Sequence, residues 1–281
     1  MFALVRDGSG VQVCSQRCRR PGIRQVRVQV ELAGVCRTDV AVARGLIPVQ
    51  RGRTLGHEFV GRIDEVGGGV PARWRGVRVS ANPIAADGRM LGVGLDGAFA
   101  EELVLPVDQL VEVPDGIPSS WAAYTEPVAA ALGAIQQVNP GGPVLVLGVG
   151  RIAQLTTRIL HARGHDAHCH GAPSGDRWAS IIDTDGLMHD LDPLLSRLVP
   201  RGVLVLQSRL SGARRFSAEL LRERGARIGG AVYGCFDEAV RMIAGGQLDL
   251  DPLIGASWPL RDWARAFSAS ESQKSFLDPT A

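Results

Sequence analysis

The sequence predicts an α/β protein with two domains, a β-rich one and one built on a doubly wound parallel sheet. Within residues 1–118, short strand-like segments are separated by glycines. Farther along, the continuous apolar run 144–147 precedes a glycine turn and a segment with helical periodicity. Strand-like and helix-like segments then alternate, which is typical of a doubly wound sheet. The chain of 281 residues is long enough for two such domains.

The first part of the chain has the pattern of a small all-β domain. Residues 26–32 alternate between apolar and polar side chains, which is the period of a half-buried strand. Residues 59–66 and 76–79 are also strand-like. Short strands between glycine turns predict a barrel or a sandwich. This pattern ends near residues 114–116, where the sequence becomes richer in alanine.

The second part has the pattern of a parallel sheet with helical connections. The alanine-rich segment 121–138 predicts a helix, and the apolar run 144–147 is expected of a parallel strand buried on both faces. Residues 152–162 have helical periodicity. Further strand and helix candidates follow at 180–182, 191–199, 203–206, 218–224 and 236–244.

Composition excludes several classes of function. The formal net charge is +2 and 5% of the residues are aromatic, so neither nucleic acid nor a membrane surface is an expected partner. No apolar run reaches the roughly 18 residues that a membrane-spanning helix needs. The N-terminal residues lack the basic and apolar regions of a signal peptide, so we expect a cytoplasmic protein.

Cysteine and lysine usage narrows the chemistry further. Five scattered cysteines, an odd number, indicate free thiols in a reducing compartment. Cys14 and Cys18 form a C-x-x-x-C pair, but no second pair completes a structural zinc site, so we expect two ordinary thiols. Every basic residue except Lys274 is an arginine, which excludes a G-K-[ST] phosphate loop.

Two short strings bring metal-ligating side chains together. Residues 34–39 (GVCRTD) and 56–58 (GHE) supply the thiol of Cys36, the hydroxyl of Thr38, the imidazole of His57 and the carboxylate of Glu58. Thiolate and imidazole are ligands that zinc prefers. Neither string has the spacing of a zinc finger. A few close ligands completed from farther along the chain are typical of catalytic zinc, which keeps an open coordination position.

A glycine turn follows the apolar run of the second part. Residues 148–153 (GVGRIA) match G-x-G-x-x-A, the alanine-ended dinucleotide fingerprint. Gly148 permits a tight turn, Gly150 lets the backbone approach a diphosphate, and Ala153 allows close helix–strand packing. The helix N-terminus then offers amides to phosphate. A tight β-to-α turn without a ligand would also favour glycine, so that alternative stays open.

The acid that usually binds a ribose hydroxyl is missing. It is expected about 20 residues after the turn, where residues 167–171 contain no Asp or Glu and Gly171 takes the expected place. This favours NADP slightly over NAD, and Arg177 is a candidate for a 2′-phosphate or an ordinary surface residue. Residues 171–180 also have no room for a full helix and strand. We therefore expect a sheet shortened on its adenine side.

With these strings in place, the chain resembles the zinc-dependent medium-chain dehydrogenase/reductase (alcohol dehydrogenase-like) family. The resemblance covers essentially the full length, and the shared order of the strings is more specific than any one of them. The strings are residues 34–39, 56–58, 96–101, 126–127, 148–153, 229–234, 251–254 and the closing segment around Lys274.

The resemblance implies a particular domain arrangement. A GroES-like β-barrel catalytic domain is expected over residues 1–120, and a shortened Rossmann nucleotide-binding domain over residues 121–256. Residues 257–281 are expected to return to the catalytic domain. In this family the two domains enclose a cleft.

The resemblance also assigns roles to the polar residues of the first part. Cys36 and His57 would be zinc ligands, and Glu126 would be the third ligand of the polyol and threonine dehydrogenase branch. Glu58 would lie beside the metal as a supporting or exchanging ligand. Thr38 would take the proton of the alcohol. Ordinary helix-start or surface carboxylates are the alternative for Glu58 and Glu126.

Cofactor contacts are implied in the same way. Arg37 and Lys274 resemble the two cations that clamp the diphosphate, although a solvated C-terminal lysine is the alternative for Lys274. The backbone at Ala231 and Tyr233 resembles the strand that binds the nicotinamide carboxamide. The glycine turn and the end of the next strand would line the rest of the cofactor through Gly148, Gly150, Arg151, Ile152 and Gly171.

Three departures from the family pattern limit the prediction. Residues 80–95 contain no cysteine, so one catalytic zinc and no structural zinc is expected, and the lobe that carries the structural zinc is deleted. Ala41 occupies the position of a frequent relay histidine. The shortened adenine side puts tight cofactor binding in doubt.

The sequence therefore predicts a zinc- and NAD(P)-linked dehydrogenase or reductase that interconverts an alcohol and a ketone or aldehyde. One alternative is a specialised biosynthetic dehydrogenase of a bulky secondary alcohol, which a deleted lobe would accommodate. The other is a degenerate family member that binds a nucleotide without catalysis. The expected partner is a small molecule, and pairing of sheet edges near residues 232–236 would give a homodimer or homotetramer.

Overall fold

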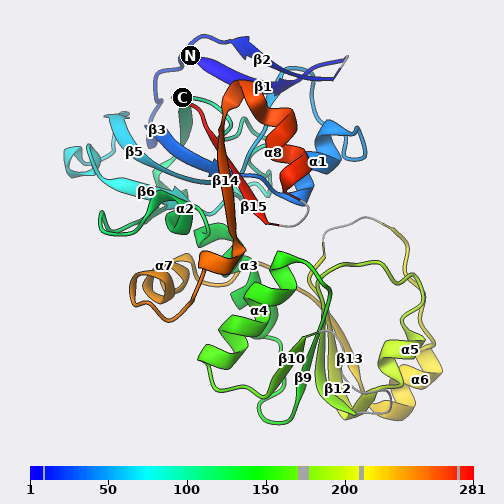
Figure 1. Cartoon of the computed structure of the whole chain (residues 1–281). Coiled ribbons are helices and arrows are strands. Elements are labelled where there is room, and N and C mark those ends of the chain that lie inside the picture. The colour runs from blue at the N-terminus through cyan, green and yellow to red at the C-terminus, as the bar shows by residue number, and fades with distance from the viewer. Residues whose placement is uncertain (9, 170–176, 209–211, 271–272) are drawn as a thin grey trace. The chain divides into compact units, whose positions relative to one another are not determined.

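The structure is a computed structural model that describes residues 1–8, 10–169, 177–208, 212–270 and 273–281. Its contacts divide the chain into two compact units (Figure 1). Unit 1 comprises residues 1–126, 236–246 and 250–281. Unit 2 comprises residues 127–235 and 247–249. Each unit is described below by itself.

Two antiparallel systems form most of unit 1. The larger sheet has seven strands in the order β14-β15-β3-β5-β6-β8, with β7 paired to β3. A smaller sheet has the order β2-β1-β4. The strands are β1 (Phe2–Arg6), β2 (Val11–Ser15), β3 (Gln25–Gly34), β4 (Arg53–Thr54), β5 (Glu58–Val66), β6 (Arg78–Ala81), β7 (Glu102–Pro106), β8 (Leu110–Glu112), β14 (Ile254–Pro259) and β15 (Lys274–Asp278).

The alternation in the first part of the sequence corresponds to the core of this unit. Val26, Val28 and Val30 of β3 are buried, as are Phe59 and Ile63 of the paired strand β5. Alternate residues of a strand point to opposite faces, so one face of β3 can enter the core while the other remains more accessible. The predicted strands in these segments are confirmed.

Short helices complete unit 1. They are α1 (Arg37–Ala43), α2 (Ser119–Ala122), α7 (Phe236–Ala244) and α8 (Trp263–Ala269), with single 3-10 turns at Ala72–Trp74, Val107–Gln109, Asp251–Leu253 and Leu260–Asp262. α8 packs beside β14 and β15 (Figure 1).

The prediction of one helix over 121–138 is wrong. The chain forms α2 and then α3 (Thr125–Ile135), with a break between them. The break turns Tyr124 into the core, where its hydroxyl donates a hydrogen bond to the Leu253 carbonyl at 3.0 Å. Burial of a large aromatic ring with a satisfied hydroxyl outweighs the alanine-rich helix propensity of the segment.

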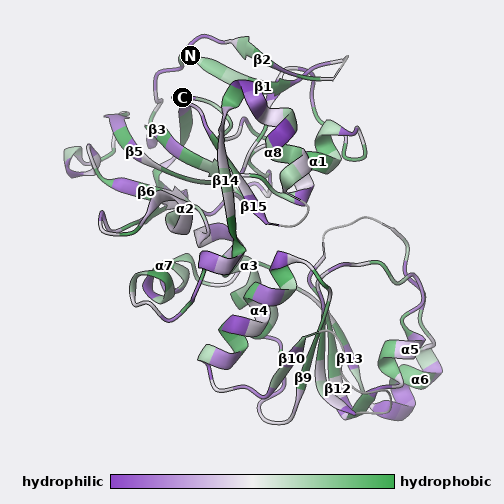
Figure 2. Ribbon diagram, viewed as in Figure 1, coloured by the Kyte–Doolittle hydropathy of each residue, from purple (hydrophilic) through white to green (hydrophobic). Residues whose placement is uncertain are grey.

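Unit 2 contains a five-stranded parallel sheet in the order β10-β9-β11-β12-β13. The strands are β9 (Val144–Leu147), β10 (Ala167–Cys169), β11 (Trp178–Asp183), β12 (Leu198–Leu206) and β13 (Arg227–Gly230), and the helices are α3, α4 (Arg151–Ala162), α5 (Asp192–Leu195) and α6 (Ala218–Arg224). Hydrophobic residues run along β9 and β12 (Figure 2), as expected of buried parallel strands.

The sheet order reverses at β9, which pairs with β10 on one side and with β11 on the other. This reversal is the switch point at which doubly wound sheets bind ligands. Among the described residues β10 is the edge strand on one side of the sheet. The predicted α/β fold, with a shortened doubly wound sheet, is therefore confirmed.

Candidate active site

The thiol of Cys36 lies at the start of α1, directly after strand β3. Cys36 is the N-cap of this helix, with extended backbone angles. Asp39, three residues later, accepts a hydrogen bond from the Cys36 backbone amide at 2.9 Å. This is the acidic half of a capping box, and it fixes the direction in which the chain leaves β3. The Cys36 thiol faces the Thr38 hydroxyl, with 3.7 Å between sulfur and oxygen.

Asp39 also contacts the segment at residues 56–58, which carries His57 and Glu58. Its other carboxylate oxygen accepts a hydrogen bond from the Gly56 amide at 3.2 Å and lies 3.3 Å from Nδ1 of His57. Asp39 and His57 are 2% and 1% exposed. Because Asp39 engages Nδ1, Nε2 is the ring nitrogen left for a metal. The sequence strings contained Asp39, but no role was predicted for it, although an acid three residues into a helix is a recognisable capping signal.

Glu58 forms an ion pair with Lys274, and both side chains are almost fully buried, at 2% and 0% exposure. The Lys274 ammonium also lies 5.7 Å from the centroid of the Tyr124 ring. Lys274 begins β15, which pairs with the end of β3. The only lysine in the sequence is therefore a buried partner of a candidate ligand, and its predicted contact with the cofactor diphosphate remains an untested prediction.

Cys36, His57 and Glu58 form a group that could hold a metal ion. One ligand atom from each residue lies within 4.8 Å of the others. A thiolate, an imidazole and a carboxylate match the donors that bind zinc. Within the part of the chain that the structure describes, this is the group of three or more such residues with this spacing. The donor set fits a single catalytic-type zinc.

The charges of Cys36 and His57 depend on each other, because each residue shifts the pKa of the other. Burial opposes ionisation of Cys36, but the neighbouring His57 outweighs it and lowers the pKa of the thiol to about 6. Burial likewise disfavours a charged His57, but Asp39 and Cys36 raise the pKa of the imidazole well above its usual value. Burial lowers the pKa of Lys274 to about 8. A thiolate–imidazolium pair is therefore favoured near neutral pH, and metal binding would displace the imidazolium proton.

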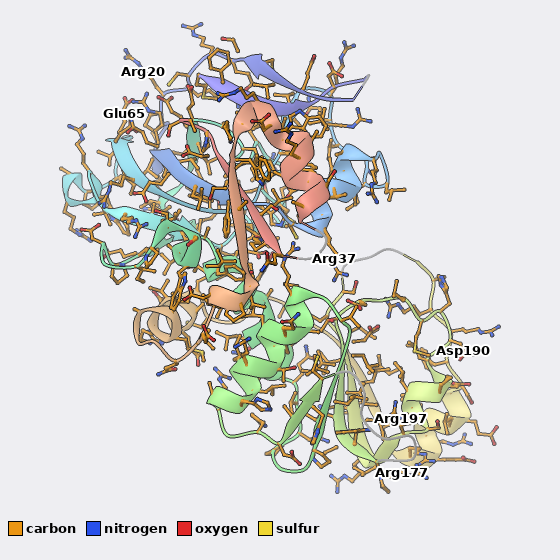
Figure 3. All side chains as sticks on the ribbon, viewed as in Figure 1. Arg20, Arg37, Glu65, Arg177, Asp190 and Arg197 are labelled. Atoms are coloured by element: carbon orange, nitrogen blue, oxygen red, sulfur yellow. The ribbon has the colours of Figure 1, made fainter. Side chains whose placement is uncertain are left out.

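The remaining residues predicted for this part of the site have separate positions. Glu126 lies in the first turn of α3 and is buried, but the close group of three does not include it. Thr38 is half-buried next to Cys36. Arg37 is exposed at the start of α1 (Figure 3). The roles assigned to these residues by resemblance remain predictions.

The glycine turn in unit 2 has the local geometry of a dinucleotide fingerprint. Gly148 has a φ of +135°, which a residue with a side chain rarely adopts. Gly150 is the N-cap of α4, and a Cβ atom built on it would meet no atom within 4 Å. Ala153 is buried between the helix and the sheet. Open space above Gly150 at the start of a twelve-residue helix fits a bound phosphate group.

The other predicted cofactor residues are spread over unit 2. Arg151 is buried and Ile152 half-buried in the first turn of α4. The Ala231 amide donates a hydrogen bond to the Leu206 carbonyl at 2.9 Å, which extends the pairing of β13 with β12. Tyr233 follows it and is half-buried. Gly171 lies outside the described residues.

Arg177 lies at the wrong end of the sheet to bind a 2′-phosphate. It immediately precedes β11, whereas the glycine turn follows the carboxyl end of the parallel strand β9. Its guanidinium donates a hydrogen bond to the Ser196 carbonyl at 2.6 Å, and Figure 3 shows it at the surface near Arg197. The preference for NADP therefore gains no support from this residue.

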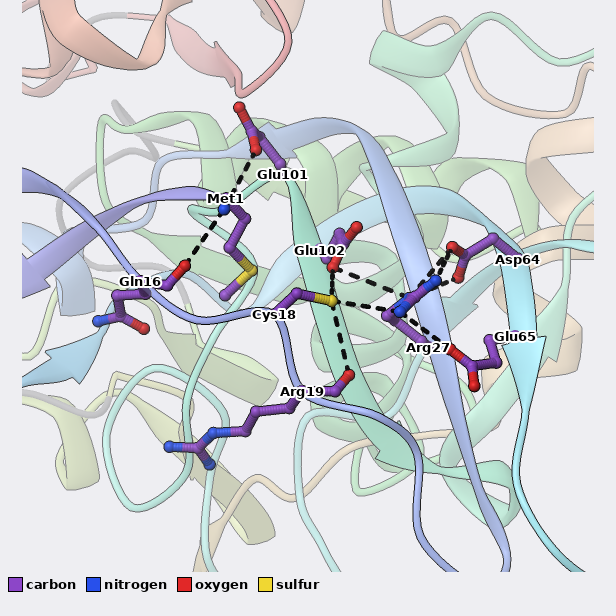
Figure 4. Close-up of polar contacts among 9 residues, drawn as sticks. All are labelled: Met1, Gln16, Cys18, Arg19, Arg27, Asp64, Glu65, Glu101 and Glu102. Atoms are coloured by element: carbon purple, nitrogen blue, oxygen red, sulfur yellow. Dashed lines mark hydrogen bonds and ion pairs between the residues drawn. The ribbon is translucent and has the colours of Figure 1, made fainter.

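Cys18, which the sequence left as an ordinary thiol, is part of a polar cluster in unit 1 (Figure 4). Its thiol donates a hydrogen bond to Glu102 at 2.5 Å and accepts one from Arg27 at 3.2 Å. Arg27 also pairs with Asp64 and Glu65. The hydrogen bond to Glu102, followed by burial, raises the pKa of the Cys18 thiol. Cys18 is therefore held as a neutral thiol rather than as a metal-binding thiolate.

The segment at residues 85–97, in the region where the structural-zinc lobe is expected to be missing, lines a cavity of about 630 Å³ in unit 1. Residues of this segment, of β7 and of the loop at residues 16–20 form its walls. Cys36, His57 and Glu58 are not among the lining residues. The cavity is therefore separate from the candidate metal group.

Comparisons with known proteins show which proteins the chain is similar to. Residues 22–115 match the alcohol dehydrogenase GroES-like domain family. The whole chain shares its fold with RspB of Escherichia coli, described as a short chain alcohol dehydrogenase complexed with NADH, at a TM-score of 0.89, 22% identity and 99% coverage of both chains. The resemblance to the medium-chain alcohol dehydrogenases is therefore confirmed, by family over residues 22–115 and by fold over the whole chain.

Particular relatives fit the same class. The starvation-sensing protein RspB of Escherichia coli is 31% identical over 176 residues, which are 56% of this chain and 52% of the relative. L-threonine 3-dehydrogenase of Xanthomonas campestris is 34% identical over 163 residues, or 50% of this chain and 47% of the relative. The matches thus span about half the length of these curated relatives. A further structure with this fold, at a TM-score of 0.87, 22% identity and 99% coverage of both chains, is described as a zinc-binding dehydrogenase of Sinorhizobium meliloti bound to NADP.

Within the described residues, no helix combines the length and apolar character that crossing a lipid bilayer requires.

Gly34→Ala is expected to destabilise unit 1 by about 1–3 kcal/mol, because the added methyl group overpacks a buried ion pair. The new Cβ would lie 2.5 Å from Cε of Lys274 and 2.8 Å from the Glu58 carboxylate. Urea unfolding measures the change. Gly116→Ala, whose Cβ would meet nothing within 4 Å, is the control. Equal stability of the two variants would contradict the close packing at Gly34.

Cys18 is expected to react with iodoacetamide at pH 8 more slowly than the exposed Cys235, because a raised pKa leaves less thiolate at that pH. Glu102→Gln removes the charge that holds the proton, so labelling of Cys18 should become severalfold faster. Peptide mass spectrometry measures both rates. Glu112→Gln, an exposed carboxylate on β8, is the matched control and should change neither.

Proposed function

We propose that this protein is an oxidoreductase that interconverts an alcohol and a ketone or aldehyde with a catalytic zinc and NAD(P). The observation that carries the proposal is the group of half-buried Cys36 with buried His57 and Glu58, whose ligand atoms lie within 4.8 Å of one another. The GroES-like domain match and the fold shared with dehydrogenases support it. The glycine turn of unit 2 supports the cofactor.

Cys36 and His57 would hold the zinc, with Glu58 as a nearby ligand and Glu126 as the proposed additional one. Zinc bound there would act as a Lewis acid toward the oxygen of the alcohol or carbonyl. Contacts within unit 1 would hold these ligands in position before a metal binds. Asp39 orients the His57 ring and fixes the Cys36 backbone, while Lys274 balances the charge of Glu58. Such supporting contacts set the affinity of a metal site.

Thr38 is the proposed proton carrier. Its hydroxyl lies next to the Cys36 sulfur and is half-buried, so it can reach both a substrate oxygen and water. A hydroxyl can accept one proton while it donates another, which suits a relay. Ala41 offers no side chain for a further relay step, so a cofactor hydroxyl or water would continue the path.

The cofactor would be held in unit 2 by the turn at Gly148 and Gly150 and by the first turn of α4. A bound nicotinamide dinucleotide would exchange a hydride with the substrate carbon. Backbone groups near Ala231 and Tyr233 would orient the nicotinamide. The structures with this fold include one complex with NADH and one with NADP. We retain a slight preference for NADP on the missing acid after β10 alone.

Two alternatives have specific observations in their favour. The short, cysteine-free segment at residues 80–95 favours a biosynthetic dehydrogenase of a bulky secondary alcohol, because a lobe shortened there would leave more room for substrate. The shortened sheet, with β10 at its edge among the described residues, favours a degenerate protein that binds nucleotide without turnover. Bound zinc together with turnover excludes the second alternative.

The proposed partner is a small molecule, and the proposed location is the cytoplasm. We also propose a homodimer or homotetramer formed through the free edge of β13. In the described sheet β13 is the last strand on its side, and Val232 beyond it is strongly exposed. An unpaired parallel edge flanked by an apolar side chain is suited to strand pairing with a second copy.

Cys36→Ser is expected to reduce bound zinc from about one ion per chain to a small fraction, because serine is a poor zinc ligand. Inductively coupled plasma mass spectrometry of purified protein measures the metal. Cys235→Ser, at an exposed thiol, is the control and should keep its zinc. Full zinc in the Cys36 variant, with an unchanged circular dichroism spectrum, would contradict the site.

Thr38→Ala is expected to lower kcat by roughly 10²–10⁴-fold if the hydroxyl relays the proton. Thr38→Ser keeps the hydroxyl and should restore most of the rate. Secondary alcohols and polyols provide test substrates, because butanediol and sorbitol dehydrogenases are among the similar proteins. Unchanged rates and an unchanged pH profile in Thr38→Ala would assign the relay to another group.

A further inference from the structure

A carboxylate meets the glycine turn of unit 2. Asp185 follows β11 by two residues, and its Oδ2 accepts a hydrogen bond from the Val149 amide at 3.3 Å. Val149 lies between Gly148 and Gly150 of the fingerprint. In dinucleotide-binding turns the backbone here comes close to the cofactor diphosphate. The Asp185 carboxylate therefore binds the Val149 amide at the place where an anionic ligand is expected to bind.

The sheet places Asp185 there. β11 pairs in parallel with β9, and Asp183 is in register with Leu147, the last residue before Gly148. Beyond the paired strands, the Thr184 amide and hydroxyl both donate to the Leu147 carbonyl, at 3.0 and 2.8 Å. These bonds hold the segment after β11 against the turn after β9.

Packing at Gly148 shows how close this approach is. A Cβ atom at Gly148 would lie 2.3 Å from Oγ1 of Thr184 and 3.0 Å from Oδ1 of Asp185. The first glycine of the fingerprint is therefore required by the segment after β11 as well as by its own φ of +135°. Gly150 is different, because nothing lies within 4 Å of its Cβ position. The turn is occupied on its Gly148 side and open on its Gly150 side.

Arg214 lies beside the segment that follows β11. Arg214 pairs with Asp183 at 2.7 Å and donates to the Gly186 carbonyl at 3.0 Å. Its charge therefore compensates Asp183, which is nearly fully buried at the end of β11. Asp185 is half-buried at the entrance of the turn. A carboxylate at this position adds negative charge next to the place where an anionic ligand is expected, and like charges at short range repel.

Asp185 does not simply replace the missing ribose acid. That acid would follow β10, which lies on the opposite side of β9 from β11. Asp185 approaches from the β11 side, toward the diphosphate position rather than toward the adenine ribose. We propose that Asp185 is a selectivity residue that competes with the dinucleotide diphosphate for the Val149 amide and weakens binding of NAD(P). The inference rests on the proposed nucleotide site.

The competition has a chemical consequence for ligand choice. A ligand that carries a diphosphate must displace the carboxylate from Val149 and tolerate its charge. A ligand that lacks phosphate, such as adenosine, neither displaces the carboxylate nor is repelled by its charge. Asp185 should therefore affect NADH, NADPH and ADP, and leave adenosine unaffected.

Asp185→Asn tests this with little change in shape, because the asparagine oxygen can still accept from Val149. Removing the charge should tighten NADH and NADPH binding by roughly fivefold to tenfold at low salt. The gain should shrink as KCl is raised, because salt screens the repulsion. Binding of NADH and NADPH is followed by nucleotide fluorescence, and binding of ADP and adenosine by calorimetry.

Two further variants separate local from global effects. Asp190→Asn makes the same change in net charge at a surface carboxylate that pairs with Arg215, and it should leave affinity unchanged (Figure 3). Asp185→Ser removes the charge with a smaller side chain and should reproduce the gain if the asparagine variant folds poorly. Melting temperatures establish that each variant is folded.

The outcomes distinguish the inference from the proposed function. Tighter binding of NADH and ADP in Asp185→Asn, with adenosine and Asp190→Asn unchanged, supports the inference. Measurable NADH binding by the wild type with no gain in Asp185→Asn, or an equal gain in Asp190→Asn, overturns the inference alone. No binding of NADH, NADPH or ADP by the wild type or by Asp185→Asn overturns both the inference and the nucleotide site.

Discussion

The candidate metal group depends on one buried carboxylate, that of Asp39. It accepts hydrogen bonds from the amides of Cys36 and Gly56 and lies against Nδ1 of His57. Two segments separated by about twenty residues are thereby fixed to each other at the positions where their ligands leave the backbone. Without this carboxylate, two buried amides would lose their partner and the His57 ring its orientation. The hydrogen bonds that Asp39 accepts from these two backbone amides therefore help to position the thiol and the imidazole even before a metal binds.

Charge balance is the second constraint. Glu58 is buried beside a thiol whose pKa is lowered to about 6 by His57 against the effect of burial, so a compensating cation favours the charged site. Lys274 supplies it from β15, near the far end of the sequence, and Gly34 leaves the room for it. The cost of burying these charges is tolerable only because they are paired. The C-terminal strand therefore belongs to the site itself, and the close pairing of β15 with β3 is a requirement of its electrostatics.

In unit 2 the glycine turn of the dinucleotide fingerprint lies next to an acidic side chain, that of Asp185. The glycine turn, the open space at Gly150 and the buried Ala153 together fit a bound phosphate group. The parallel register of β9 and β11 brings Asp185 to this turn. The same sheet is short on its other side, where β10 is the edge among the described strands. Both features support our proposal that nucleotide binding at this turn is weaker or more selective than the glycine pattern alone suggests.

The sequence by itself determined the fold class, the strands around Val26–Val30 and Val144–Leu147, and the identity of the candidate ligands Cys36, His57 and Glu58. These follow from local periodicity and residue chemistry, which require no knowledge of distant contacts. Only the tertiary structure decided that Asp39 supports the ligands, that Lys274 pairs with Glu58, and that Asp185 reaches Val149. The segment 121–138 likewise forms two helices instead of one, because Tyr124 between them is buried in the core. Each of these depends on contacts between residues far apart in sequence, which strand register and burial fix and local patterns cannot.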